Sequence, residues 1–143
     1  MHAKLINDQP ERTFALIFET GDEVVSTIEA FAAEQRLVAS RITAIGAFRE
    51  ATLGYFDWQS KAYERIEIGE QVEVLSLIGD VAREGDRPKL HAHVVLGRRD
   101  ASTCGGHLLR AIVRPTLEVL LTDSPRHLQR RSDAETGLAL IRV

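Results

Sequence analysis

Residues 71–97, QVEVLSLIGDVAREGDRPKLHAHVVLG, decide how this chain folds. Residues 71–79 are apolar and partly alternating, and residues 90–97 are again apolar and β-prone, so each stretch predicts a strand. Between them, the glycine and proline of EGDRP at residues 84–88 predict a turn. Long strands in hairpin-like succession favour an antiparallel sheet.

Further strands are predicted on both sides of this stretch. They share an apolar, β-prone composition between turn signals and cover residues 12–18, 39–47, 51–57, 62–68, 116–122 and 137–143. Residues 51–57 and 62–68 are predicted to form a hairpin, and Gly46 is predicted to interrupt the strand at 39–47. Residues 107–113 fit either a strand or a short helix.

One long helix is predicted near the N-terminus. Asp22 follows Thr20 and Gly21 and can accept hydrogen bonds from free backbone N–H groups, so it is the expected N-cap. Apolar residues then recur at helical spacing up to about Arg36, namely Val24, Val25, Ile28, Phe31 and Ala32. Many strands with one early helix predict an α+β domain with a mainly antiparallel sheet. Such a sheet leaves edges and faces to cover, so we also expect oligomerisation.

Length and composition predict a single globular domain over residues 1–143. Hydrophobic residues make up 44% of the chain and charged residues 27%, which argues against a disordered or fibrous protein. The apolar runs are far shorter than the roughly 20 residues of a membrane helix. The first residues lack the apolar core of a signal peptide, so we expect a cytoplasmic protein, and the lone Cys104 excludes an internal disulfide.

The charges are distributed unevenly, although the formal net charge is only −3. Residues 1–86 carry 8 Lys and Arg against 16 Asp and Glu, whereas residues 87–143 carry 10 against 5. The basic C-terminal portion is compatible with an acidic ligand, with the acidic half of a neighbouring subunit, or with an ordinary solvated surface.

Three of the five histidines lie close together in the sequence. His91 and His93 are two residues apart on the predicted strand at 90–97, so their side chains share one face of it. At that separation two imidazoles can bind one metal ion. His107 follows Gly105 and Gly106, whose missing side chains allow a close backbone approach. If His107 returns beside the strand, three nitrogens hold a metal and leave a coordination position open, as in catalytic or ligand-binding sites.

Several alternatives remain open at this level. The histidines are also compatible with polar residues on a solvent-facing surface, and Cys104 is a potential fourth ligand that would close the site. Glu73 and Glu118 lie in predicted strands, where each is either an outward-facing charge or a carboxylate that orients a histidine of the site. The common phosphate-loop, dinucleotide and nucleophile-elbow motifs are absent, so no reaction can be named.

The chain resembles the PPC family, the plants and prokaryotes conserved domain, over nearly its whole length. The resemblance is carried by the order and spacing of short segments: residues 12–22, Ile45-Gly46-Ala47, Tyr55, residues 73–79, His91-Ala92-His93, Gly105-Gly106-His107 and residues 116–119. It implies an α+β fold with a central antiparallel sheet and flanking helices, assembled as a homotrimer. In stand-alone prokaryotic members the matching histidines bind a divalent metal, usually zinc, which here implies His91, His93 and His107.

The resemblance also raises a DNA-associated or regulatory role. Plant members carry a separate AT-hook peptide that binds DNA, but no R-G-R-P hook occurs in this chain. Arg126, Arg130 and Arg131 are the expected phosphate contacts of that alternative. The sequence therefore predicts first a trimeric, zinc-like metal protein with a small-ligand pocket that includes Glu73, Cys104, Gly105, Gly106 and Glu118. The alternatives are a DNA-associated module and a plain structural oligomer.

Overall fold

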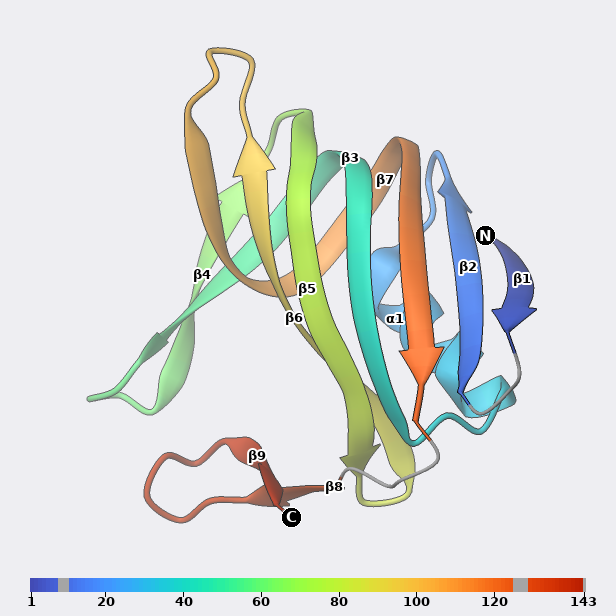
Figure 1. Cartoon of the computed structure of the whole chain (residues 1–143). Coiled ribbons are helices and arrows are strands. Elements are labelled where there is room, and N and C mark those ends of the chain that lie inside the picture. Colours follow the sequence, from blue (N-terminus) through green and yellow to red (C-terminus); the bar gives the residue numbers. More distant parts are fainter. Residues whose placement is uncertain (8–10, 125–128, 143) are drawn as a thin grey trace.

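The computed structural model describes residues 1–7, 11–124 and 129–142 (Figure 1). The strands are β1 His2–Asn7, β2 Arg12–Glu19, β3 Ala39–Asp57, β4 Ala62–Ile68, β5 Val72–Glu84, β6 Arg87–Gly97, β7 Thr103–Asp123, β8 Gln129–Ser132 and β9 Ala139–Arg142. The helix α1, Val24–Glu34, is the only helix among the described residues, so the expectation of several flanking helices is not met. No helix in this part of the chain is long and apolar enough to cross a membrane.

One curled sheet contains all the strands. Its order is β1-β2-β7-β3-β5-β8-β9, with β4 paired to β3 and with β6 paired to both β5 and β7. Every pairing is antiparallel except β5 with β8, which confirms the predicted mainly antiparallel sheet. Because β7 also pairs with β3, and β3 with β5, the strands β3, β5, β6 and β7 form a closed circuit of pairings.

Two strands are much longer than predicted. β3 runs on through Gly46 as a bulge, where its register with β5 and β7 shifts. A side chain at Gly46 would have its Cβ 2.4 Å from the carbonyl oxygen of Thr116, so this glycine permits close strand packing rather than ending the strand. The stretches predicted at 107–113 and 116–122 are both parts of β7. Residues 107–113, which fitted either a strand or a short helix, are therefore a strand.

The predicted helix is present, but its predicted cap is wrong. The cap is Glu23, whose carboxylate accepts hydrogen bonds from the N–H groups of Val25 and Ser26 at 3.1 and 2.7 Å. Asp22 instead accepts from the N–H of Glu19 at 3.0 Å and thus stabilises the preceding turn. The glutamate has the longer side chain and reaches back over the first turn, and it also accepts from the N–H of Ala111 in β7. The cap therefore ties the helix to the sheet.

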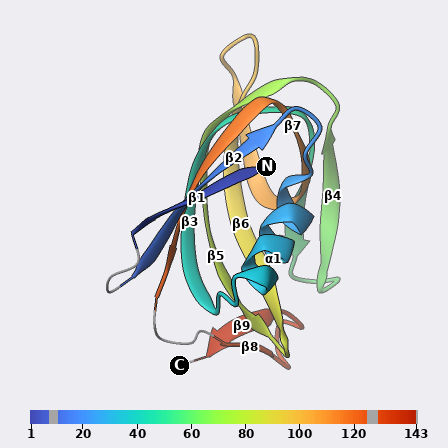
Figure 2. The same ribbon diagram turned by 90° about the vertical axis from the view of Figure 1, so that its right-hand side faces the viewer.

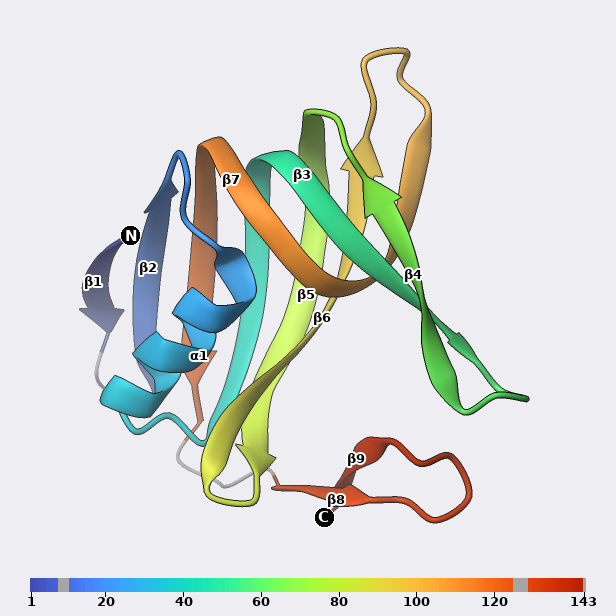
Figure 3. The ribbon, with the colours of Figure 1, turned by 180° about the vertical axis from the view of Figure 1, so that it is seen from behind.

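The helix fills the curl of the sheet (Figures 2 and 3). Its buried face consists of Val24, Ile28, Phe31 and Ala32. Phe31 packs edge-on against Phe14 of β2, with ring centroids 5.2 Å apart. Burial of each larger side chain, Val24, Ile28 and Phe31, stabilises the fold by about 1.5–3 kcal/mol relative to exposure.

The sheet also exposes apolar side chains, which we call the outer apolar face. This set comprises Ile17 of β2, Ile45 of β3, Leu75 and Ile78 of β5, Val95 of β6 and Leu120 of β7. Five of them, all except Val95, line a surface hollow of about 510 Å³. Two exposed aromatic residues, Tyr55 and Trp58, lie at the β3–β4 hairpin. This hairpin was predicted, and it projects from the body of the molecule (Figure 1).

Candidate metal centre

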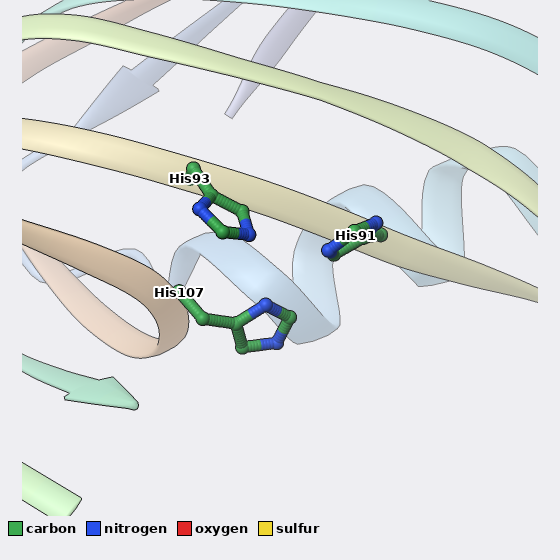
Figure 4. A group of neighbouring side chains, drawn as sticks. All are labelled: His91, His93 and His107. Atoms are coloured by element: carbon green, nitrogen blue, oxygen red, sulfur yellow. The ribbon is translucent and has the colours of Figure 1, made fainter. Parts of the chain in front are cut away.

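The three histidines come together where β6 pairs with β7. His93 and His107 are directly opposite each other in the β6–β7 ladder, and His91 lies two residues along β6 from His93. Their ring centroids are 5.1–5.4 Å apart, and one ligand nitrogen from each lies within 4.8 Å of the other two. Figure 4 shows the three rings facing a common space. The shared face predicted for His91 and His93, and the return of His107 beside them, are confirmed.

Glycines allow the backbones at this point to approach closely. A Cβ at Gly105 would lie 2.5 Å from the carbonyl oxygen of Val94, and a Cβ at Gly79 would lie 2.4 Å from that of His91. A Cβ at Gly106 would lie 3.1 Å from the carbonyl oxygen of Gly54, the β3 partner of His107. The glycines next to His107 therefore have the role predicted for them, which is to admit neighbouring backbone.

One nitrogen of the cluster fits a metal especially well. In Figure 4, Nδ1 of His107, the ring nitrogen bonded to Cγ, points toward His91 and His93. This nitrogen is buried and has no hydrogen-bond partner among the described residues. An unsatisfied buried polar atom costs about 1–3 kcal/mol, and a metal ion would remove that cost. The donor set, three imidazoles, suits zinc and similar transition metals.

The site also keeps His91 and His107 in the neutral form that binds metals. Burial, reinforced by the nearby His91 and His93, lowers the pKa of His107 to about 4. Burial also lowers the pKa of His91, helped by the positive charge of Arg130 and opposed by Asp80. Neutral imidazole is the metal ligand, so neither residue needs to lose a proton near neutral pH.

Three residues that the sequence did not single out for this site surround the cluster. Tyr63 of β4 stacks on the His107 ring with centroids 4.7 Å apart. Asp80 of β5 lies opposite His91, its carboxylate 3.8 Å from Nδ1, and also forms a 2.5 Å ion pair with Arg130 of β8. The sequence did contain a signal for Asp80, because a hairpin whose turn is residues 85 and 86 places residue 80 opposite residue 91. No local signal indicates Tyr63 or Arg130.

A pocket of about 160 Å³ opens beside the cluster, between His91 and His107 on one side and the C-terminal hairpin β8–β9 on the other. Its lining is Tyr63, Glu84, Lys89, Leu90, His91, His107, Arg130, Leu138, Ala139 and Leu140. A separate hollow of about 250 Å³ reaches the exposed His93 from the outer face. The cluster is thus accessible from two sides.

The other residues expected at the site lie elsewhere. Cys104 is half-buried opposite Leu96 and is not part of the histidine group. Glu73 of β5 is exposed and pairs with Gly97 of β6. Gly97 lies four residues along β6 from His93. Glu118 is exposed and lines the hollow on the outer apolar face. The structure does not bring these three side chains to the histidines.

The arginines of the nucleic-acid alternative are also separated. Arg126 lies outside the described residues. Arg130 is only 8% exposed and is paired with Asp80, so it does not present its charge to a duplex, whereas Arg131 is exposed.

Solved structures share this fold over almost its whole length. A metal-containing protein from Archaeoglobus fulgidus is 36% identical, with 99% of this chain and 97% of that chain covered and a TM-score of 0.86. A plant- and prokaryote-conserved protein from Pyrococcus horikoshii is 30% identical, with 92% of each chain covered and a TM-score of 0.87. A candidate DNA-binding protein from Bacteroides thetaiotaomicron is 28% identical, with 98% and 96% covered and a TM-score of 0.88.

A search of curated proteins finds no match. The family model of the Plants and Prokaryotes Conserved (PCC) domain, also written PPC, matches residues 6–125. This match covers most of the chain and includes all three histidines. The chain therefore belongs to the Plants and Prokaryotes Conserved domain family, as its resemblance indicated.

Proposed function

We propose that this protein binds a divalent transition metal, zinc by its donor set, through His91, His93 and His107. The observation that carries the proposal is the buried, unpartnered Nδ1 of His107, which faces the other two rings. The metal-containing relative from Archaeoglobus fulgidus supports it, because 97% of that chain aligns with this one. Three imidazoles leave a coordination position for a small ligand, and we place that ligand in the 160 Å³ pocket.

The surrounding residues hold the ligand set in place. Asp80 faces Nδ1 of His91, which leaves Nε2 of that ring for the metal. Tyr63 restricts rotation of the His107 ring by stacking on it. When bound, a metal in such a site supplies a Lewis acid with an open position. The residues identify a binding site, and they do not specify a reaction.

We further propose that the protein is a homotrimer assembled through the outer apolar face. Ile78, which is 63% exposed, is the cross-strand partner of His93, so the apolar face reaches the edge of the histidine cluster. A second copy of the chain on this face would cover both the apolar residues and His93. That the oligomer has three subunits is what the family resemblance implies.

The DNA-associated role has narrower support. It rests on relatives such as the candidate DNA-binding protein from Bacteroides thetaiotaomicron and on exposed basic residues such as Arg131. Phosphate contacts lose affinity steeply as salt rises, so duplex binding that is present at low salt, falls as salt rises and weakens in Arg131→Ala would support this alternative. The burial of Arg130 removes one of its expected contacts.

Elemental analysis tests the metal site. We expect about one transition metal per chain in protein purified without chelator or added metal, and loss of most of it in His107→Ala. Cys104→Ser is the matched control, because Cys104 lies outside the histidine group, and it should retain the metal. A metal-free wild-type protein that also fails to take up added zinc would contradict the proposal.

A further inference from the structure

The pocket beside the histidines has two chemically different walls. One is apolar and is formed by the ring of Tyr63 and by Leu90, Leu138, Ala139 and Leu140. The other carries the histidines, Arg130 and Lys89. Leu138, Ala139 and Leu140 of the apolar wall and Arg130 of the charged wall come from the C-terminal hairpin, which lies beyond residues 6–125 that match the family model (Figure 3). The family-model match therefore does not account for these four residues of the lining.

Arg130 is an incompletely satisfied cation in this wall. Its Nη2 pairs with Asp80 at 2.5 Å, and its Nη1 donates to the carbonyl oxygen of Ala139 at 3.1 Å. Its Nε is buried and has no partner among the described residues. A buried guanidinium with a free donor favours an additional acceptor, and a carboxylate suits guanidinium geometry.

The other charged residues of the lining, Glu84 and Lys89, contribute less to the electrostatic potential in the pocket. Glu84 is exposed, so water screens its negative charge more than it screens the buried Arg130. Lys89 pairs with Glu29 at 3.2 Å. With a divalent metal on the histidines, the metal and Arg130 make one wall of the pocket positive, although the pair with Asp80 offsets part of the Arg130 charge. The wall formed by Leu138, Ala139 and Leu140 is apolar.

We infer that the pocket binds a small organic anion, a carboxylate with a short alkyl chain, and this rests on the proposed metal site. The carboxylate faces Arg130 and the metal, and the alkyl chain packs on Leu138 and Leu140. A volume of about 160 Å³ corresponds to about five water molecules at roughly 30 Å³ each, which suits a four-carbon acid. Inorganic phosphate lacks the apolar part, and an alkylammonium ion has the wrong charge.

The test uses the full chain loaded with Co²⁺, whose visible spectrum reports changes in its coordination. Butanoate, phosphate and butylammonium are titrated separately at constant ionic strength, and dissociation constants are taken from the spectra and from calorimetry. We expect saturable butanoate binding at least about tenfold tighter than that of the other two. Butanoate binding should weaken about tenfold in Arg130→Gln and stay unchanged in Arg131→Gln, with cobalt content equal in all three proteins.

A second variant guards against disruption of the hairpin by Arg130→Gln. Leu140→Asp places a negative charge in the apolar wall and should weaken butanoate binding while leaving cobalt uptake intact. Equal binding of butanoate and phosphate, tighter binding of butylammonium, or unchanged affinity in both variants would overturn the inference and leave the metal site standing. Failure of the wild type to take up Co²⁺ would overturn the metal site and this inference together.

Discussion

His93 and His107 are direct cross-strand partners in the β6–β7 ladder, with ring centroids 5.4 Å apart. Their relationship is therefore set by backbone hydrogen bonding, and not by flexible loops. His91 follows two residues along β6 on the same face. A ligand set built on paired strands is rigid before any metal arrives, which reduces the conformational entropy lost on binding.

The first prediction concerns the close approach of these strands. Gly105→Ala should destabilise the protein by about 1–3 kcal/mol and weaken metal binding, because the new Cβ would lie 2.5 Å from the carbonyl oxygen of Val94 and push β6 from β7. Gly69→Ala is the control, since its Cβ would meet no atom within 4 Å. Urea denaturation and zinc titration measure both effects. Equal behaviour of the two variants would show that close packing at Gly105 is unimportant.

The second prediction concerns the ion pair behind His91. Asp80→Asn should destabilise the protein by about 2 kcal/mol, because it leaves the buried guanidinium of Arg130 without its carboxylate, a loss moderated by the partial exposure of Asp80. Asp86→Asn removes an exposed pair with Arg83 and should change stability by less than about 0.5 kcal/mol. Chemical denaturation at pH 7 compares the variants. A smaller loss in Asp80→Asn than in Asp86→Asn would contradict the buried role of Arg130.

The third prediction is a pH dependence of the metal-free protein. The folded pKa of His107 is about 4, below its ordinary value near 6.5, so the unfolded chain binds a proton first as the pH falls. Stability should therefore decline from about pH 6.5 toward about pH 4 and gain nothing from this group at higher pH. Denaturation midpoints between pH 7.5 and 4.5 check this, and His107→Gln should flatten the profile. An unchanged slope in that variant would assign the dependence to other groups.

The fourth prediction concerns assembly. Ile78→Asp should convert the oligomer to monomer without loss of β-sheet signal in circular dichroism, because it places a charge in the outer apolar face. Ile66→Asp is the control, since Ile66 is exposed on β4 outside that face. Sedimentation and light scattering give the masses, with a trimer expected for the wild type and for Ile66→Asp. A monomeric wild type would contradict the proposed trimer.

Sequence reasoning was accurate where the interactions are local. The alternation at residues 71–79, the turn at 84–88 and the β3–β4 hairpin were all predicted, because side-chain period and turn chemistry depend on near neighbours. The helix was predicted too, but its cap is Glu23 and not Asp22. The carboxylate of Glu23 also accepts a hydrogen bond from β7, a contact between residues far apart in the sequence. β1 and β8 were not predicted, and their strand state depends on pairing with β2, β5 and β9.

By itself the sequence determined the antiparallel strands, the shared face of His91 and His93, and the glycines that admit His107. Only the tertiary structure decided that His107 lies opposite His93 and that Tyr63 and Arg130 enclose the cluster. The physical reason is the range of the interactions. Strand alternation follows from backbone geometry over two residues, whereas the pairings β5–β6, β6–β7 and β5–β8 depend on how the whole sheet curls and closes.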